Sequence, residues 1–334
     1  MKGRTILVAS VIFGVALLCG YLVAANVNLL PEVASTRGDL MQQLFNFLLG
    51  AATVVFVLVE GLLVYSVIRF RRRSGDEGQG AAIHGNTALE VFWTAIPALL
   101  VVVIAVYSFR VLSESEAAAE EPMIVEVIGR QFAWEFRYPE LGLVSSDLHL
   151  PVAEPVRFEI TSDDVIHSFW VPNFLAKRDA TPGQISEFSV TPNEVGIYPV
   201  RCAELCGPGH AAMVSQVIVE SPEEFQAWAE RMASLPSDPT EAGRLLFGRY
   251  GCTGCHVLAD AGASGLVGPS LEGIGTRAGS TVAGLDAEAY LRQSILEPNA
   301  HLVPTYLENL MPGDFGTRIP QNELDLLVTY LAGR

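Results

Sequence analysis

The sequence predicts a multidomain membrane protein, in which a two-helix transmembrane hairpin precedes an antiparallel β-barrel or sandwich and a small all-α domain. Three observations predict this fold class. Long apolar runs are concentrated in the first 112 of the 334 residues. Short runs that alternate apolar and polar residues occupy 123–220. Helical spacing with glycine-rich loops then returns over 241–334.

Five segments are expected along the chain. They are 1–25, a signal peptide or extra membrane span; 26–112, the hairpin; 113–220, the β-domain; 221–240, a helix and linker; and 241–334, the helical domain. The first segment is an apolar run behind Lys2 and Arg4, and Val23-Ala24-Ala25 offers a small-residue cleavage site. A cleaved signal peptide is the preferred interpretation, and an uncleaved third span is the alternative.

Two later runs, 44–68 and 91–112, are each long enough to cross a hydrocarbon layer about 30 Å thick. The loop between them begins with four arginines at the membrane end: Arg69, Arg71, Arg72 and Arg73. The positive-inside rule places this loop in the cytoplasm. Everything from about residue 113 onward is therefore expected outside the cytoplasm.

The charge of the chain restricts its partners. The formal net charge is −16, and most of the 37 acidic residues follow the membrane spans. Phosphate binding needs a basic patch, so nucleic acid is not expected as a partner. An acidic surface suits a basic soluble protein instead.

A cluster of soft ligands lies near the end of the β-domain. It comprises two cysteines four residues apart, two histidines and a methionine: His167, Cys202, Cys206, His210 and Met213. Thiolate, imidazole and thioether select copper over hard cations. A single blue-copper site needs one cysteine, so the second cysteine predicts two bridged coppers. The alternative is a Cys202–Cys206 disulfide, which leaves the other three residues unexplained.

Several motifs of this region resemble the CuA domain of cytochrome c oxidase subunit II. They are DDVIHSFWVP around His167, KRDATPG at 177–183, C-x-E-x-C-x3-H-x2-M from Cys202, and HGNTALEVFWTAIP at 84–97. The resemblance covers about residues 40–220 and implies a cupredoxin-like Greek-key β-barrel. It also implies that Cys202 and Cys206 bridge both coppers, that His167 and Met213 complete one copper, and that His210 and the Glu204 carbonyl complete the other.

The same resemblance implies roles for three further positions. The Glu204 side chain matches a residue that reaches Mg²⁺ at the contact with subunit I; the alternative is a solvated acid. The aromatic patch where cytochrome c delivers its electron is richer in tryptophan in the family, and here Phe132 and Ala133 replace two of its aromatics while Trp134 remains. This change indicates that electron entry has moved, although these aromatics also suit a barrel core.

Residues 252–256 read Cys-Thr-Gly-Cys-His, the signature of covalent haem c attachment, with His256 as an iron ligand. Met311 is the preferred sixth ligand, and His301 is its competitor. A redox-active C-x-x-C is the alternative. Gly243 to Phe247, Gly268-Pro269 and the final helix resemble a class I cytochrome c, in which the first and last helices cross and Pro269 accepts a hydrogen bond from the ligand histidine.

Together these resemblances imply the electron-entry subunit of a haem-copper cytochrome c oxidase with a fused cytochrome c, a tethered donor of high effective concentration. Neither predicted span contains a histidine, so O₂ reduction and its coupled proton translocation belong to subunit I, which holds haem a and the haem-copper centre. The implied partners are subunit I, other oxidase subunits, a cytochrome c donor and membrane lipid. The implied location is a bacterial inner membrane, with both redox domains periplasmic.

Two acidic residues near the membrane have either a role in proton transfer or a purely structural role. Glu90 matches the carboxylate at the mouth of a proton-uptake channel in the family, and equally suits a helix start. Glu60 lies inside the first span and has no family role. Two other functions remain open: a CuA subunit of a nitric oxide or nitrous oxide reductase, and a copper-delivery or thiol-redox protein.

Overall fold

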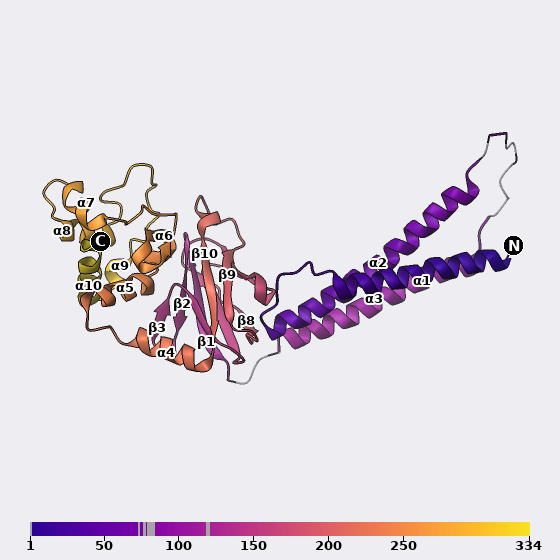
Figure 1. The fold of residues 1–334 in the computed structure, drawn as a ribbon, viewed down its shortest axis with the longest axis horizontal. Helices are drawn as coiled ribbons and strands as arrows, with labels where there is room; N and C mark the ends of the chain where they lie inside the picture. Colours follow the sequence, from indigo (N-terminus) through magenta and orange to yellow (C-terminus); the bar gives the residue numbers. More distant parts are fainter. Residues whose placement is uncertain (1, 73, 76–77, 79–83, 118–120) are drawn as a thin grey trace. The chain divides into compact units, whose positions relative to one another are not determined.

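The computed structural model describes residues 2–72, 74–75, 78, 84–117 and 121–334. Arg73, one of the four arginines used to orient the chain, lies outside the described residues. The chain divides into two compact units, 1–33 with 39–117, and 34–38 with 118–334. The first unit is helical, and the second contains all the strands together with the C-terminal helices (Figure 1).

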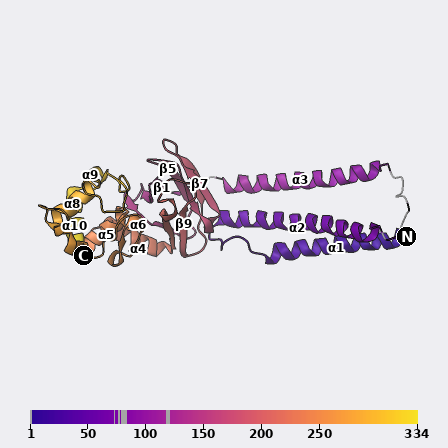
Figure 2. The same ribbon diagram turned by 90° about the horizontal axis from the view of Figure 1, so that it is seen from above.

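Three long helices form the first unit, where the sequence predicted a hairpin of two. They are α1 (Lys2–Asn26), α2 (Thr36–Phe70) and α3 (Thr87–Ser115), and each is long and apolar enough to cross a membrane. Figure 2 shows their axes roughly aligned, with the chain direction of α2 opposite to that of α1 and α3. The prediction of two long helices was one too few, because the first 25 residues are as apolar and as helical as the two predicted spans. Cleavage of a signal peptide within this segment stays a prediction.

Small residues bring α1 close to α2. A Cβ atom added at Gly20 would lie 2.5 Å from Val54 Cγ2, and one at Gly50 would lie 3.1 Å from Ala24 Cβ. Glycine and alanine allow helix backbones to approach in this way inside a bilayer, where packing replaces the hydrophobic effect as the driving force. The described helix α1 therefore has a packing partner within its own chain.

Ten strands form the β-domain. They are β1 (Met123–Arg130), β2 (Ala133–Tyr138), β3 (Leu143–Ser145), β4 (Leu148–Pro151), β5 (Val156–Ser162), β6 (His167–Val171), β7 (Ala176–Ala180), β8 (Ser186–Val190), β9 (Gly196–Cys202) and β10 (Val214–Glu220). They make two five-stranded sheets, ordered β3-β2-β1-β5-β8 and β4-β10-β9-β6-β7. The alternation predicted over β5 is confirmed, since Val156, Phe158 and Ile160 are fully buried.

The pairing within these sheets is mixed. Most neighbours are antiparallel, as expected, but β1 pairs with β5 in parallel and β4 pairs with β10 in parallel. Each parallel pair joins strands that are not consecutive in the chain, which is what a Greek-key crossover produces. The architecture is that of a cupredoxin-like β-sandwich, and its core carries many of the large aromatic side chains, including Phe136, Phe158 and Phe169.

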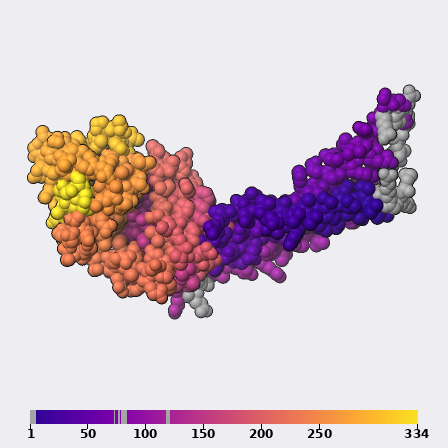
Figure 3. All heavy atoms as spheres, in the orientation of Figure 1, coloured from indigo at the N-terminus to yellow at the C-terminus, as the bar shows by residue number. Residues whose placement is uncertain are grey.

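Helices dominate the rest of the second unit. They are α4 (Pro222–Ala233), α5 (Pro239–Arg249), α6 (Cys252–Cys255), α7 (Ile274–Thr281), α8 (Ala287–Leu296), α9 (Phe315–Arg318) and α10 (Gln321–Ala332). One small departure from the expected all-α domain is a two-stranded sheet of β11 (Val257–Leu258) and β12 (Ala263–Ser264). Residues from α5 onward have a separate apolar core. Figure 3 shows their orange and yellow atoms against those of the β-domain.

Helices α5 and α10 cross at a glycine, as the resemblance implied for the first and last helices of this domain. A Cβ atom at Gly243 would lie 2.2 Å from Tyr330 Cβ and 2.7 Å from the Leu326 carbonyl oxygen. Only glycine allows so close an approach, because any side chain would collide with the backbone of α10.

Candidate functional site

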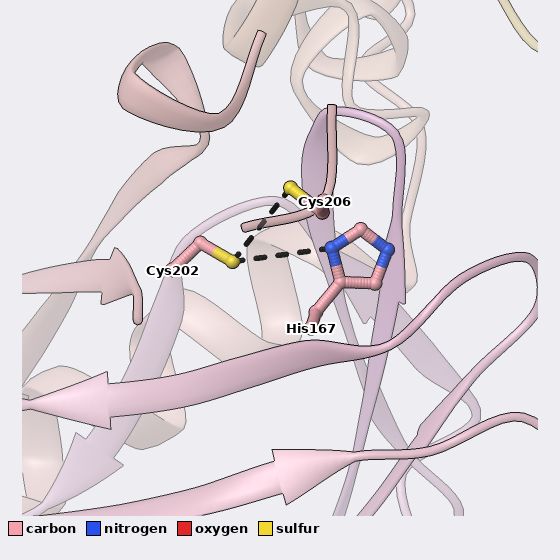
Figure 4. A group of neighbouring side chains, drawn as sticks. All are labelled: His167, Cys202 and Cys206. Atoms are coloured by element: carbon pink, nitrogen blue, oxygen red, sulfur yellow. Dashed lines mark hydrogen bonds between the residues drawn. The ribbon is translucent and has the colours of Figure 1, made fainter. Parts of the chain in front are cut away.

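The soft ligands meet at one end of the β-sandwich. His167 is the first residue of β6 and Cys202 is the last residue of β9, while Cys206 lies on the loop that leads to β10. The Cys202 Sγ atom is 3.9 Å from His167 Nδ1 and 3.9 Å from Cys206 Sγ. Figure 4 shows both sulfurs and this ring nitrogen converging. These three buried side chains form a group with metal-ligand geometry.

The remaining predicted ligands surround the second cysteine. Cys206 Sγ is 3.7 Å from His210 Nδ1 and 3.9 Å from Met213 Sδ, and Met213 is fully buried. The backbone carbonyl of Glu204 lies 3.3 Å from Cys202 Sγ, while its side chain is exposed. The structure thus brings the predicted copper ligands together around two sulfurs.

The sulfurs are not joined to each other. Their separation of 3.9 Å is nearly twice the length of a disulfide, which is about 2.05 Å, and both cysteines are free. Burial alone would raise the pKa of Cys202, but hydrogen bonds, first of all from His167, lower the pKa to about 6. Burial and the neighbouring Cys202 charge raise the pKa of Cys206 to about 12. One thiolate is therefore already favoured, and thiolate is the form that binds a soft metal.

A carboxylate and an amide hold this cluster in place, and the sequence reasoning assigned neither of them a role. The Asp164 Oδ1 atom lies 2.8 Å from His167 Nε2, which leaves Nδ1 facing the sulfurs. The Gln131 backbone N–H donates to Asp164 Oδ2 at 2.7 Å, and its side-chain amide donates to the Cys206 carbonyl at 2.5 Å. A carboxylate hydrogen-bonded to the second nitrogen of a ligand histidine is a recurrent feature of metal sites. In the sequence, this role of Asp164 is indicated only by its position three residues before His167.

Phe132 lies directly against the loop from Cys202 to Met213, which we call the copper loop. A Cβ atom at Gly209 would lie 2.3 Å from Phe132 Cδ2, and one at Gly207 would lie 3.1 Å from Phe132 Cζ. Both glycines are needed because the aromatic ring occupies the space of their missing side chains. Trp134 is also buried, with its ring centroid 6.0 Å from that of His167. Both aromatics therefore contact the cluster or its immediate support.

The C-x-x-C-H residues line a cavity of about 580 Å³. Helices and loops of the C-terminal region form most of its wall, and residues 130–135, 145 and 146 of the β-domain line the rest. His256 Nδ1 lies 2.7 Å from the Pro269 carbonyl oxygen, as the resemblance implied. This hydrogen bond leaves Nε2 free for a metal. Met311 and its competitor His301 both line the same cavity.

The two thiols of this motif are not poised for thiol chemistry. Burial raises the pKa of Cys252 to about 12 and that of Cys255 to about 11. A redox-active C-x-x-C depends on a lowered pKa at one cysteine, so this environment disfavours that alternative. An apolar cavity with two neutral thiols and an oriented imidazole fits a covalently attached porphyrin.

The two membrane acids have different surroundings. Glu90 Oε1 accepts the Asn86 backbone N–H at 3.4 Å, and Asn86 Oδ1 accepts the Leu89 N–H at 3.2 Å, so Glu90 belongs to the N-terminal cap of α3. Glu60 lines an otherwise apolar hollow with residues of α2 and α3, among them Val59 and Leu100. Helix capping accounts for the position of Glu90 without a proton channel.

A membrane-anchored cupredoxin-like domain with two cysteines, two histidines and a methionine at one end defines the class of copper-bearing electron-transfer subunits. Two family models match the chain: residues 23–111 match the transmembrane domain of cytochrome c oxidase subunit II, and residues 141–221 match its periplasmic domain. The chain belongs to the cytochrome c oxidase subunit II family. It is thus a subunit of an oxidoreductase, with the electron-entry role of that family.

Curated relatives agree with this assignment. Cytochrome c oxidase subunit 2 of Thermostichus vulcanus is 37% identical over 279 residues, which cover 67% of this chain and 85% of the relative. That of Alkalihalophilus pseudofirmus is 31% identical over 305 residues, covering 86% of this chain and 85% of the relative. The periplasmic domain of subunit II from Bradyrhizobium japonicum aligns with a TM-score of 0.33 and 29% identity, covering 35% of this chain and 96% of that structure.

The family assignment has three direct consequences. The chain is a membrane protein with a domain outside the cell membrane. The family implies a CuA copper centre, for which the His167, Cys202 and Cys206 group provides the donors. It also implies partnership with oxidase subunit I and a cytochrome c donor.

Proposed function

We propose that this chain is the electron-entry subunit of a bacterial haem-copper cytochrome c oxidase and that it carries a haem c of its own. The observation that carries the proposal is the coexistence of two sites in one compact unit. One is the cluster of side chains around Cys202 and Cys206, and the other is the cavity lined by Cys252, Cys255 and His256. Neither reductases nor copper-delivery proteins receive support from the matched family models, which both describe oxidase subunit II.

The copper pair is assigned to the ligands that surround the two sulfurs. Cys202 and Cys206 would hold both metals, His167 and Met213 would serve one copper, and His210 with the Glu204 carbonyl would serve the other. Support comes from the soft donor set and from the distances of 3.3–3.9 Å between each sulfur and its neighbouring donor atoms. Asp164 orients the His167 ring, and the buried sandwich end excludes water from the sulfurs.

The haem is assigned to the cavity of the C-terminal helices. Cys252 and Cys255 would attach it, and His256 through Nε2 and Met311 would ligate its iron. Pro269 fixes the histidine ring by accepting its Nδ1–H. A haem held there would supply one-electron transfer between an external cytochrome c and the copper site, on the proposed route to haem a in subunit I, where O₂ reduction and proton translocation belong.

The surroundings of the two sites support transfer between them. Phe132 contacts the copper loop through Gly207 and Gly209, and it also lines the cavity that contains Cys255. A single residue thus touches both sites. Trp134 lines the same cavity and lies edge-to-face with His167. These two aromatics are the proposed residues of the electron path.

The remaining roles extend to the membrane partners. The exposed Glu204 side chain is free to reach Mg²⁺ at the contact with subunit I. Glu90 is proposed at the entrance of a proton pathway into that subunit, in addition to its capping of α3. Both redox domains face the periplasm, and the helices contact lipid, subunit I and the other oxidase subunits.

The proposal is tested on the purified oxidase. We expect a c-type α-band, a near-infrared CuA band, two coppers and one covalent haem per copy of this chain. Copper analysis, a pyridine haemochrome assay and haem staining of the denatured chain measure these quantities separately. A chain without covalent haem would leave an ordinary CuA subunit. A chain with a Cys202–Cys206 disulfide and no copper would exclude the oxidase assignment of this site.

A further inference from the structure

The haem-attachment motif lies directly on strand β2. A Cβ atom at Gly254 would lie 3.7 Å from the Cβ of Ala133, and Phe132 and Cys255 line the same cavity. Two apolar residues of the C-terminal region, Val267 and Leu310, pack against the core of the β-domain. An aromatic residue at 133 would occupy the space where α6 now sits. The small side chain is therefore what permits this approach.

Neutral hydrogen bonds support the same contact at a second point. The Ser146 Oγ atom lies 3.0 Å from the Gly248 carbonyl and 3.0 Å from Thr253 Oγ1. The Ser146 carbonyl in turn accepts a hydrogen bond from Ser215 Oγ at 2.7 Å, which ties this loop to β10. The contact is consequently anchored in the sheet and does not depend on a free loop.

The charged contact is centred on Glu135, whose side chain is 11% exposed. Glu135 accepts hydrogen bonds from three arginines: Arg130 at 2.8 Å and Arg137 at 2.7 Å, both of the β-domain, and Arg318 of α9. Arg130 is itself fixed by Asp163 at 2.7 Å. Burial would raise the pKa of Glu135, but the arginines outweigh it and hold the pKa below its usual range. The carboxylate stays charged and presents one fixed acceptor to Arg318.

We propose that Glu135 and Arg318 form an electrostatic latch that holds α6 against Phe132 and Ala133, so that the haem is kept in register with the copper loop. The inference rests on the proposed function, because it concerns electron transfer between those two sites. Neither residue is a ligand of either proposed centre; both line the haem cavity and pair with each other there, so they act as positioning residues. A fixed arrangement removes the search for a productive encounter between the two sites.

The latch also closes the aromatic surface of the β-domain. Phe132 and Trp134 are each only 2% exposed, so a soluble donor has no access to either ring while the latch is formed. The external cytochrome c must therefore dock on the C-terminal helices. In this arrangement the C-terminal haem region covers the surface around Phe132 and Trp134, where a separate cytochrome c would otherwise dock.

The test is the rate of haem-to-copper electron transfer within the intact purified oxidase, measured by flash photoreduction. Arg318→Glu places a second negative charge beside Glu135, and like charges in a contact cost enough to slow the transfer at least about tenfold. Arg318→Lys keeps the charge and retains the rate within about threefold of wild type. Arg292→Glu is the matched control: this arginine pairs with Asp325 on the same group of helices, away from the contact.

A dependence on salt separates a latch from general stability. The wild-type rate is expected to be independent of ionic strength, because the pair is buried and poorly screened. The Arg318→Glu rate should depend on it, because its two sites must meet by diffusion. An Arg318→Glu rate equal to that of wild type, with the haem and copper bands intact, would overturn the latch. Missing bands in the wild-type oxidase would instead overturn the proposed function.

A second variant avoids the charge change. Ala133→Trp inserts a bulky side chain between β2 and α6, and it should slow haem-to-copper transfer while making the copper pair directly reducible by external cytochrome c. Both bands should remain. An unchanged intramolecular rate in this variant contradicts the proposed docking even if Arg318→Glu fails to assemble.

Discussion

The copper cluster and the haem cavity differ in how much of each site is formed by neighbouring residues. At the copper end, each sulfur has the other sulfur and one histidine ring nitrogen within 3.9 Å, and hydrogen bonds from Gln131 and to Asp164 fix the loop. The proposed haem site is a cavity of about 580 Å³ lined by helices and loops of the C-terminal region and by residues of β1, β2 and β3. A metal pair needs a few atoms at set distances. A porphyrin needs volume, which only packing of distant segments supplies.

The most severe test of this comparison removes one ligand from each site. Cys206→Ser should abolish the near-infrared band and both coppers while the haem spectrum remains, because the bridging sulfur has no substitute. Cys255→Ala should remove one thioether link and shift the pyridine haemochrome spectrum while copper stays bound. Cys19→Ser, in α1, is the control that should change neither. Loss of both centres from one substitution would show that the sites are not independent.

Deleting the whole haem region tests its place in the pathway. A chain that ends at residue 240 should oxidise external cytochrome c about 10²-fold more slowly, because a tethered donor supplies a high effective concentration that a soluble one lacks. Steady-state oxygen consumption measures this. The near-infrared band checks that the copper site survives. Unchanged turnover would mean that electrons bypass the haem.

A smaller effect is expected from the group that orients the copper ligand. Asp164→Asn should weaken copper binding by about 10–100-fold, since the carboxylate fixes the ring and the tautomer of His167. Competition with a copper chelator measures the affinity. Asp163→Asn is the adjacent control, because Asp163 bonds Arg130 and not the histidine. Equal affinities for the two variants would leave Asp164 without this role.

The helix crossing gives a test confined to the haem region. Gly243→Ala should destabilise this region by about 1–3 kcal/mol, because the new methyl group overlaps the backbone of α10. Gly248→Ala lies in the same helix with nothing within 4 Å of the added Cβ, and should be neutral or slightly stabilising. Thermal loss of the Soret circular dichroism measures both, while the copper band reports that the other site is unaffected.

The weakest effect concerns pH. The pKa of Glu135 is held below its ordinary value of about 4.3, so its contribution to stability is complete above that value and is lost as pH falls through the folded pKa. Arg130, Arg137 and Arg318 surround it, with Asp163, Glu126 and Asp314 behind them. Near pH 7 Glu135→Gln should cost about 2 kcal/mol, and this difference should shrink below pH 4. Urea titrations at both pH values measure it; a constant difference contradicts the assignment.

Much of the fold follows from patterns that are local in the chain. Long apolar runs predict α2 and α3, and alternation predicts β5, because a bilayer and a half-buried sheet impose those periods directly. The prediction was incomplete where local patterns have two meanings. The first 25 residues suit both a signal peptide and a third helix, and the structure places a helix there that packs on α2.

The sequence by itself determined which donor atoms each proposed site can offer, since the C-x3-C-x3-H-x2-M and C-x-x-C-H spacings set which of them share one loop or one helical turn. Only the tertiary structure decided what connects them. Glu135 and Arg318 are 183 residues apart, and no local period relates them. Their pairing, and the packing of α6 on Ala133, require contact between two separate cores. The free energy of that contact is a property of surfaces that exist only after each core has folded.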